Sequence, residues 1–132
     1  MGIKKKHLTI MEAQASIPMV RQSLSKIFEI NNAMIVLKQV NIKSSDPYED
    51  IYREITTNKQ FFELNYMLFK ELETLLEMGV VVKDLNAGLV DFFSKHKGKE
   101  IFLCWRVGED RISYWHEIGS NYTGRKPISM LS

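Results

Sequence analysis

Five large apolar residues recur every seven positions in the middle of this 132-residue chain, and they constrain its fold more than any other feature. Ile51 and Leu72 occupy the complementary heptad position, which Asn58 and Asn65 hold at the centre of the run. The spacing predicts a coiled-coil seam on one helix of roughly thirty residues, or about 45 Å. Asparagine in a seam either fixes register and partner number or marks a place where the seam widens and admits water, and both interpretations stay open. The five residues are Tyr48, Ile55, Phe62, Phe69 and Leu76.

The segment before this helix predicts a first helix that a proline interrupts. Thr9 and Glu12 have the spacing of a capping box at a helix start. Pro18 predicts a kink after about two turns, and a long helix should then continue to about Ile42. The apolar residues that give this second part its helical period are Val20, Leu24, Ile27, Met34 and Leu37.

Turn and capping residues separate the two helices and end the second. Residues 44–47 (Ser-Ser-Asp-Pro) supply a turn, an N-cap and a proline for the first helical position, and Gly79 suits a helix C-terminus. Residues 8–78 should therefore form a long antiparallel helical hairpin. Because a helix of this length exceeds what the small C-terminal region can cover, we expect one edge of the hairpin to pack against another copy of the chain in a dimer or higher oligomer.

The C-terminal part, residues 79–128, predicts a small antiparallel sheet of about four strands. Its β-branched or alternating segments follow one another with short polar turns between them, so a meander is the simplest arrangement. The whole chain, residues 1–132, is then expected to form one α+β domain. The four segments are 80–82, 88–93, 100–107 and 112–118.

A two-residue loop at Glu109-Asp110 would set the register of the last two strands. Leu103 would then lie opposite His116, and Trp105 opposite Tyr114, on an apolar face that covers the helices. The other face would carry a mixed set of side chains. That set is Leu89, Asp91, Phe93, Phe102, Cys104, Arg106, Trp115 and Glu117.

This mixed face is the candidate binding surface, because aromatic side chains among unlike charges suit a partner or a ligand. The alternative is that the chain's own tail, residues 119–132, covers it. The expected site residues are Asp91, Arg106, Trp115, Glu117 and Arg125.

Composition limits the partners and the compartment. A net charge of +2 is too small for an electrostatic footprint on nucleic acid, and acidic residues are interspersed with the basic clusters at 4–7, 95–99 and 125–126, so nucleic acid is not expected as a partner. Lone Cys104 excludes an internal disulfide and any multi-cysteine metal site, which suits a reducing cytoplasm. No apolar run approaches a membrane span, and no metal or other cofactor motif occurs.

Catalytic arrangements are less favoured than ion pairs that orient loops. A metal site built from Asp91, His116 and Glu117 is disfavoured, because adjacent residues of a strand point to opposite faces. Nucleophilic catalysis by Cys104 with His116 as base is disfavoured because the predicted register also separates these two residues. We expect a cytoplasmic binding or scaffolding module that self-associates through its helices. The alternative is a small hydrolase-type enzyme with a carboxylate–histidine site between sheet and helices.

Several short motifs in the second half resemble a known family. They are GVVVKDLNAGLVDF at 79–92, LCW at 103–105, GE at 108–109, YWHE at 114–117 and GRKPI at 124–128. Together they resemble the uncharacterised family called domain of unknown function 2203. The chain departs from the family pattern at Phe93, where proline is expected, and at 120–123, where the family tends to a glycine and an aromatic residue.

The family resemblance implies no established activity, but it places nine residues in motif positions. Four of these are Asp91, Cys104, Trp115 and Arg125. The other five, a second choice of site residues, are Lys83, Asp84, Trp105, Glu109 and His116.

Overall fold

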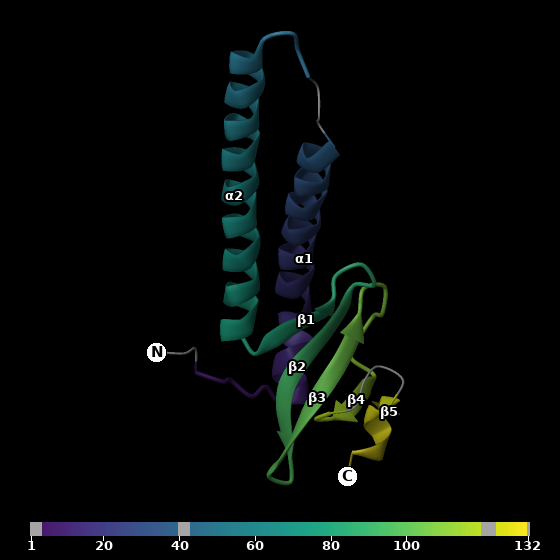
Figure 1. The fold of residues 1–132 in the computed structure, drawn as a ribbon. Helices are drawn as coiled ribbons and strands as arrows, with labels where there is room; N and C mark the ends of the chain where they lie inside the picture. The colour runs from purple at the N-terminus through teal and green to yellow at the C-terminus, as the bar shows by residue number, and fades with distance from the viewer. Residues whose placement is uncertain (1–3, 40–42, 120–123, 132) are drawn as a thin grey trace.

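Two long helices are followed along the chain by a five-stranded sheet (Figure 1). The computed structural model of the chain describes residues 4–39, 43–119 and 124–131. The predicted α+β class is confirmed, with a fifth strand beyond the expected four. The elements are α1 (Ile10–Gln39), α2 (Pro47–Glu77), β1 (Val80–Asp84), β2 (Leu89–His96), β3 (Lys99–Arg106), β4 (Tyr114–Glu117), β5 (Lys126–Pro127) and the short 3-10 helix η2 (Ile128–Met130).

The helices α1 and α2 form the expected antiparallel hairpin, and the predicted capping residues begin both of them (Figure 1). Thr9 Oγ1 accepts a hydrogen bond from the backbone N–H of Glu12 at 3.1 Å, and Glu12 Oε1 accepts one from the N–H of Thr9 at 2.9 Å. At the start of α2, Asp46 Oδ1 accepts a hydrogen bond from the N–H of Tyr48 at 3.0 Å. These side chains satisfy amides that no preceding helical turn can reach.

Pro18 lies inside α1, so the short helix expected before it and the long helix expected after it are one continuous element. The proline is on the exposed side of the helix, while Ile17 and Val20 are buried against the sheet. The packing of α1 against the sheet thus outweighs the loss of the backbone hydrogen-bond donor at Pro18. The helix is described as far as Gln39, and the expected continuation to Ile42 lies outside the described residues.

The heptad residues of α2 are exposed, although they form the most regular apolar pattern in the chain. Leu75 is the buried residue of α2, and Lys38 of α1 lies 5.0 Å from the ring centroid of Phe61 on another side of the helix. The heptad pattern therefore does not describe the contact within the hairpin. We call the five exposed residues the heptad stripe: Tyr48 (75% exposed), Ile55 (55%), Phe62 (67%), Phe69 (60%) and Leu76 (39%).

The sheet is the predicted meander, in which consecutive strands pair antiparallel from β1 to β5. β2 continues to His96, which pairs with Lys99, so the connection to β3 is only two residues long. Those residues, Lys97 and Gly98, have φ angles of 52° and 77°. Positive φ at both central positions is what the tightest hairpin turn requires.

The last long pairing of the meander is one residue out of the predicted register. Leu103 lies opposite Trp115 and not opposite His116, and Tyr114 lies opposite Cys104 and not opposite Trp105. Because side chains of a strand alternate between faces, this shift turns every side chain of β4 to the other side of the sheet.

The connection between β3 and β4 causes the shift, because it is not a two-residue hairpin. Trp105 Nε1 donates a hydrogen bond to the backbone oxygen of Glu109 at 3.1 Å, which bends the chain back over the end of β3. Ile112 is buried, and its N–H donates to Oε1 of Gln14 in α1 at 2.9 Å. These contacts hold the connection on α1 and delay the start of β4 to Tyr114.

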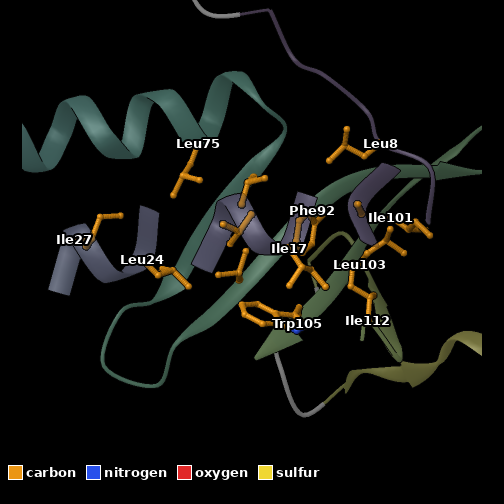
Figure 2. Close-up of a cluster of buried hydrophobic side chains, with 14 residues drawn as sticks. Leu8, Ile17, Leu24, Ile27, Leu75, Phe92, Ile101, Leu103, Trp105 and Ile112 are labelled. Carbon is orange, nitrogen blue, oxygen red and sulfur yellow. The ribbon is translucent and has the colours of Figure 1, made fainter. Parts of the chain in front are cut away.

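The hydrophobic core lies between α1 and one face of the sheet (Figure 2). Ile17 and Leu24 project from α1 towards the sheet, where Phe92 and Trp105 lie, and Ile27 lies farther along α1 on the side of Leu75. We call this side of the sheet the inner face. Its other buried residues include Val80, Val90, Ile101 and Leu103, and Leu75 contributes from the end of α2.

Candidate functional site

The side of the sheet that points away from α1 carries polar and aromatic side chains, and we call it the outer sheet face. β2, β3 and β4 contribute its members in two rows of cross-strand neighbours. Alternation along each strand places these residues opposite the core. The first row is Asp91, Cys104 and Tyr114, and the second is Phe93, Phe102 and His116.

A buried carboxylate–histidine pair lies at the centre of this face. His116 Nε2 is 3.1 Å from Asp91 Oδ2, and the two side chains are 3% and 2% exposed. His116 Nδ1 is 3.1 Å from the backbone oxygen of Glu117. Both ring nitrogens therefore lie within hydrogen-bonding distance of an oxygen.

Asp91 is held in a poorly hydrated position. Burial raises the pKa of its carboxyl above the usual range, and the hydrogen bond and charge of His116, followed by the charge of Lys83, oppose the rise. Lys83 Nζ is 4.0 Å from Asp91 Oδ2. Within the described residues, Asp91 Oδ1 is buried without a hydrogen bond of ordinary geometry, and the adjacent Cys104 thiol offers only a weak interaction.

Cys104 shares the outer sheet face with His116, so the expectation that the two lie on opposite faces is wrong. Burial, followed by the charge of Asp91, nevertheless raises the pKa of the Cys104 thiol to about 11, against an opposing effect of Arg125. A thiolate is the nucleophilic form of cysteine. Cys104 is therefore unsuited to act as a nucleophile near neutral pH.

Three aromatic rings of the outer sheet face each have a cation above them. Lys5 Nζ lies 5.3 Å from the ring centroid of Phe93, and Lys83 Nζ lies 5.1 Å from that of Phe102. The guanidinium carbon of Arg125 lies 3.9 Å from the centroid of Tyr114. The ring of Phe102 is also in contact with two others, with 5.1 Å between the centroids of Phe93 and Phe102 and 5.2 Å between those of Phe102 and His116.

Two of the five expected site residues do not lie on this face. Trp115 packs against the core cluster, with its indole nitrogen buried and without a hydrogen-bond partner among the described residues. Glu117, opposite Ile101 on the inner side, forms ion pairs with Lys99 at 3.5 Å and Lys126 at 3.9 Å. The one-residue register shift explains both corrections.

The other expected residues are on the outer side or at its margin. Asp91 is central, as described above. Arg106 is exposed, and its Nε donates to the backbone oxygen of Ala87 at 3.3 Å. Arg125 covers the ring of Tyr114 and lies 3.7 Å from Oε2 of Glu109. The structure therefore brings Asp91 and Arg125 to the same side as His116, and separates them from Trp115.

Of the five second-choice residues, two belong to the outer sheet face and three have structural roles. Lys83 and His116 belong to the outer sheet face. Asp84 accepts a hydrogen bond from the N–H of Ala87 and so forms part of a turn. Trp105 is fully buried in the core, and Glu109 Oε1 accepts a hydrogen bond from the N–H of Arg106.

Tyr114 and Lys5 are members of this face that the sequence interpretation did not place there, whereas it placed Phe102 correctly. A correct prediction of the register between β3 and β4 would have placed Tyr114 on this face, but no local signal in the sequence places the N-terminal Lys5 over β2. The carboxylate–histidine pair that an enzymatic function requires does form, on the outer sheet face and not between sheet and helices. No cluster of three or more His, Cys, Asp or Glu side chains suited to a metal ion occurs in residues 4–39, 43–119 and 124–131.

The fold and this face define an α+β protein in which a helical hairpin precedes a sheet with a buried carboxylate–histidine pair. The chain belongs to the family described as "Uncharacterized conserved protein (DUF2203)", which matches residues 6–128. The predicted family is thus confirmed. Curated proteins and solved structures include no significant match to the chain. Neither helix of the hairpin, nor any other helix in the described part, has the length and apolar composition needed to cross a bilayer.

Proposed function

We propose that this protein is a binding module that forms a homodimer through α2. The heptad stripe carries the proposal, because its five large apolar side chains recur every seven residues and are all exposed. Exposed apolar stripes of this period pack against a second helix. Tyr52 and Tyr66 extend the stripe on one side and Ile51 on the other, and they are 65%, 68% and 58% exposed.

The apolar area on α2 is large enough for a stable pair. The heptad stripe and its three neighbours comprise eight side chains, and large apolar residues exposed to this degree present roughly 100 Å² each. The total is about the 800 Å² per partner that a standard interface buries. Monomers rarely leave an apolar patch of this size in water.

Charged residues of α2 favour an antiparallel pair. Lys59 and Glu73 are exposed and stand between members of the heptad stripe, four residues after Ile55 and Phe69 respectively. In a parallel pair each of them would face its own copy, and like charges placed opposite one another repel. In an antiparallel pair centred near Tyr66, Lys59 of one chain approaches Glu73 of the other. The two sheets then lie at opposite ends of the dimer.

The test is the mass of the particle by light scattering, for the full chain and for two variants. Ile55→Lys combined with Phe62→Lys places two charges on the heptad stripe and should yield a monomer with an unchanged circular dichroism spectrum. Gln60→Lys is the control, because Gln60 is exposed but borders the groove towards Val36 and Leu37 of α1. A monomeric parent chain, or a dimer that persists in the double variant, would refute the proposal.

A cytoplasmic location is part of the same proposal. Cys104 is a free and buried thiol, and reducing compartments keep such thiols unmodified. Fractionation of cells that express the tagged chain tests the location. Recovery in the cytosolic fraction supports it, and recovery in a secreted or membrane fraction contradicts it.

A further inference from the structure

We propose that the outer sheet face, with the lysines around it, binds single-stranded nucleic acid. The proposal concerns the sheet and is independent of dimer formation through α2. Three observations carry it: a basic surface made by two distant segments, acidic groups that are paired with basic side chains, and partly exposed aromatic rings with cations above them.

The fold brings two basic segments of the sequence together at one end of the sheet. The N–H of Leu8 donates a hydrogen bond to the backbone oxygen of Phe93 at 2.7 Å, and Ser94 Oγ donates to that of Leu8 at 2.6 Å. Residues 4–7 therefore run beside the β2–β3 hairpin, residues 93–102. Together these two segments contain six lysines and one acidic residue, Glu100. The rest of the chain has more acidic than basic side chains, so the net positive charge is concentrated at this end.

Three acidic residues on the outer sheet face or at its margin are each paired with a basic side chain, so they do not stand unpaired before an approaching polyanion. Glu100 Oε1 lies 3.2 Å from Lys5 Nζ and 2.8 Å from His7 Nε2. Asp91 is buried against His116, and Glu109 lies beside Arg125. Because an ion pair carries no net charge, the excess of positive charge at this end comes from the remaining lysines of the two segments, among them the exposed Lys95 and Lys97.

The aromatic rings distinguish nucleic acid from other polyanions. Phe93, Phe102 and Tyr114 are all partly exposed on one face of the sheet. Lys5 and Lys83 are 50% and 46% exposed, so phosphates can reach their ammonium groups beside the rings. A base can then stack on the ring while the lysine contacts the backbone, which is how single strands bind without sequence preference.

The charge component is tested by fluorescence anisotropy of the full chain with labelled oligo(dT) and oligo(rU) at a series of salt concentrations. The logarithm of the binding constant should fall linearly with the logarithm of salt concentration. Lys95→Ala with Lys97→Ala, both exposed at the hairpin tip, should reduce the slope by about 1.4, at about 0.7 for each phosphate contact removed. Lys26→Ala with Lys70→Ala removes the same charge from exposed positions on α1 and α2 and should leave the slope unchanged.

The stacking component is tested at Phe102. Phe102→Leu keeps an apolar side chain against His116 and Lys83 but removes the ring, and it should weaken binding about 5- to 150-fold. Phe102→Trp keeps a stacking surface and should retain binding. Thermal melts of each variant confirm that the fold is intact.

Four results would overturn the proposal. They are no binding at low salt, equal loss in the two lysine pairs, unchanged affinity of the folded Phe102→Leu variant, and equal or tighter binding of poly-glutamate, phosphatidylserine vesicles or duplex DNA of the same length. The last result would assign the face to an acidic protein, a membrane surface or double-stranded DNA.

Discussion

Asp91 of β2 and His116 of β4 meet across the intervening strand β3, with Oδ2 and Nε2 3.1 Å apart and both side chains almost completely buried. The pair lies on the outer sheet face, where an isolated carboxylate would be poorly hydrated. Each residue is therefore the main compensation for burying the other.

The first prediction concerns this dependence. His116→Phe should reduce the free energy of unfolding by about 3–5 kcal/mol, because it leaves Asp91 buried without its partner. Adding Asp91→Leu should cost much less than the sum of the single changes. Urea denaturation of the two single variants and the double variant measures the coupling. Additive effects would show that the two side chains do not depend on each other.

The second prediction concerns the pH dependence that Cys104 contributes. Its thiol pKa is raised from 9.0 to about 11, so between these values the folded chain keeps a proton that the unfolded chain has lost. Stability should therefore fall as pH rises through this range, by about 1–3 kcal/mol in total. The difference in free energy of unfolding between the parent chain and Cys104→Ala isolates the effect from other titrating groups. A difference that stays constant from pH 8 to 11 would contradict the burial of this thiol.

The third prediction compares one substitution at two glycines. Gly79 and Gly98 both have positive φ, of 87° and 77°. A Cβ at Gly98 would meet nothing within 4 Å, whereas one at Gly79 would come 2.8 Å from the backbone oxygen of Lys6. Gly98→Ala should cost about 1–2 kcal/mol through backbone strain alone.

Gly79→Ala should cost clearly more, because the N-terminal segment must also move away from the end of α2. Urea denaturation of the two variants provides the comparison. Equal losses would mean that residues 4–7 are not held against Gly79.

The fourth prediction tests the direction of the α2 pair. In an antiparallel dimer, Lys59→Glu and Glu73→Lys should each weaken association by about 0.5–1 kcal/mol, and the double exchange should restore it. A parallel dimer would respond differently, because each single change replaces one like-charged pair with another. Sedimentation equilibrium of the four proteins gives the dissociation constants.

Local signals in the sequence were sufficient for the helical hairpin and for four of the five strands in their order, but not for β5 or for the continuity of α1 through Pro18. The Thr9–Glu12 capping box and the Asp46 N-cap involve residues at most three positions apart, so the sequence shows them directly. The same holds for the Gly79 helix end. The position of the heptad stripe could not be read in this way, because periodicity shows that a helix has an apolar side but not what covers it.

The composition of the outer sheet face was predictable only in part. Asp91 and Cys104 were placed correctly, since the short hairpin between β2 and β3 fixes the register in which these two residues lie opposite each other. Trp115 and His116 were each assigned to the wrong face of the sheet. The register of β4 depends on the contact of Ile112 with Gln14, and these two residues are 98 positions apart in the sequence. Lys5 was missed for the same reason, as its neighbour Glu100 is 95 residues distant. Long-range contacts of this kind leave no periodic trace in a single sequence.

The connection at residues 107–113 has a consequence for how this family can vary. Adding one residue there would place Trp115 where His116 now lies beside Asp91, and deleting one would place Glu117 there. Substitutions in the connection do not change which residue of β4 lies beside Asp91, as long as the length of the connection is kept. Among relatives, the number of residues between these strands should therefore be more uniform than their identity.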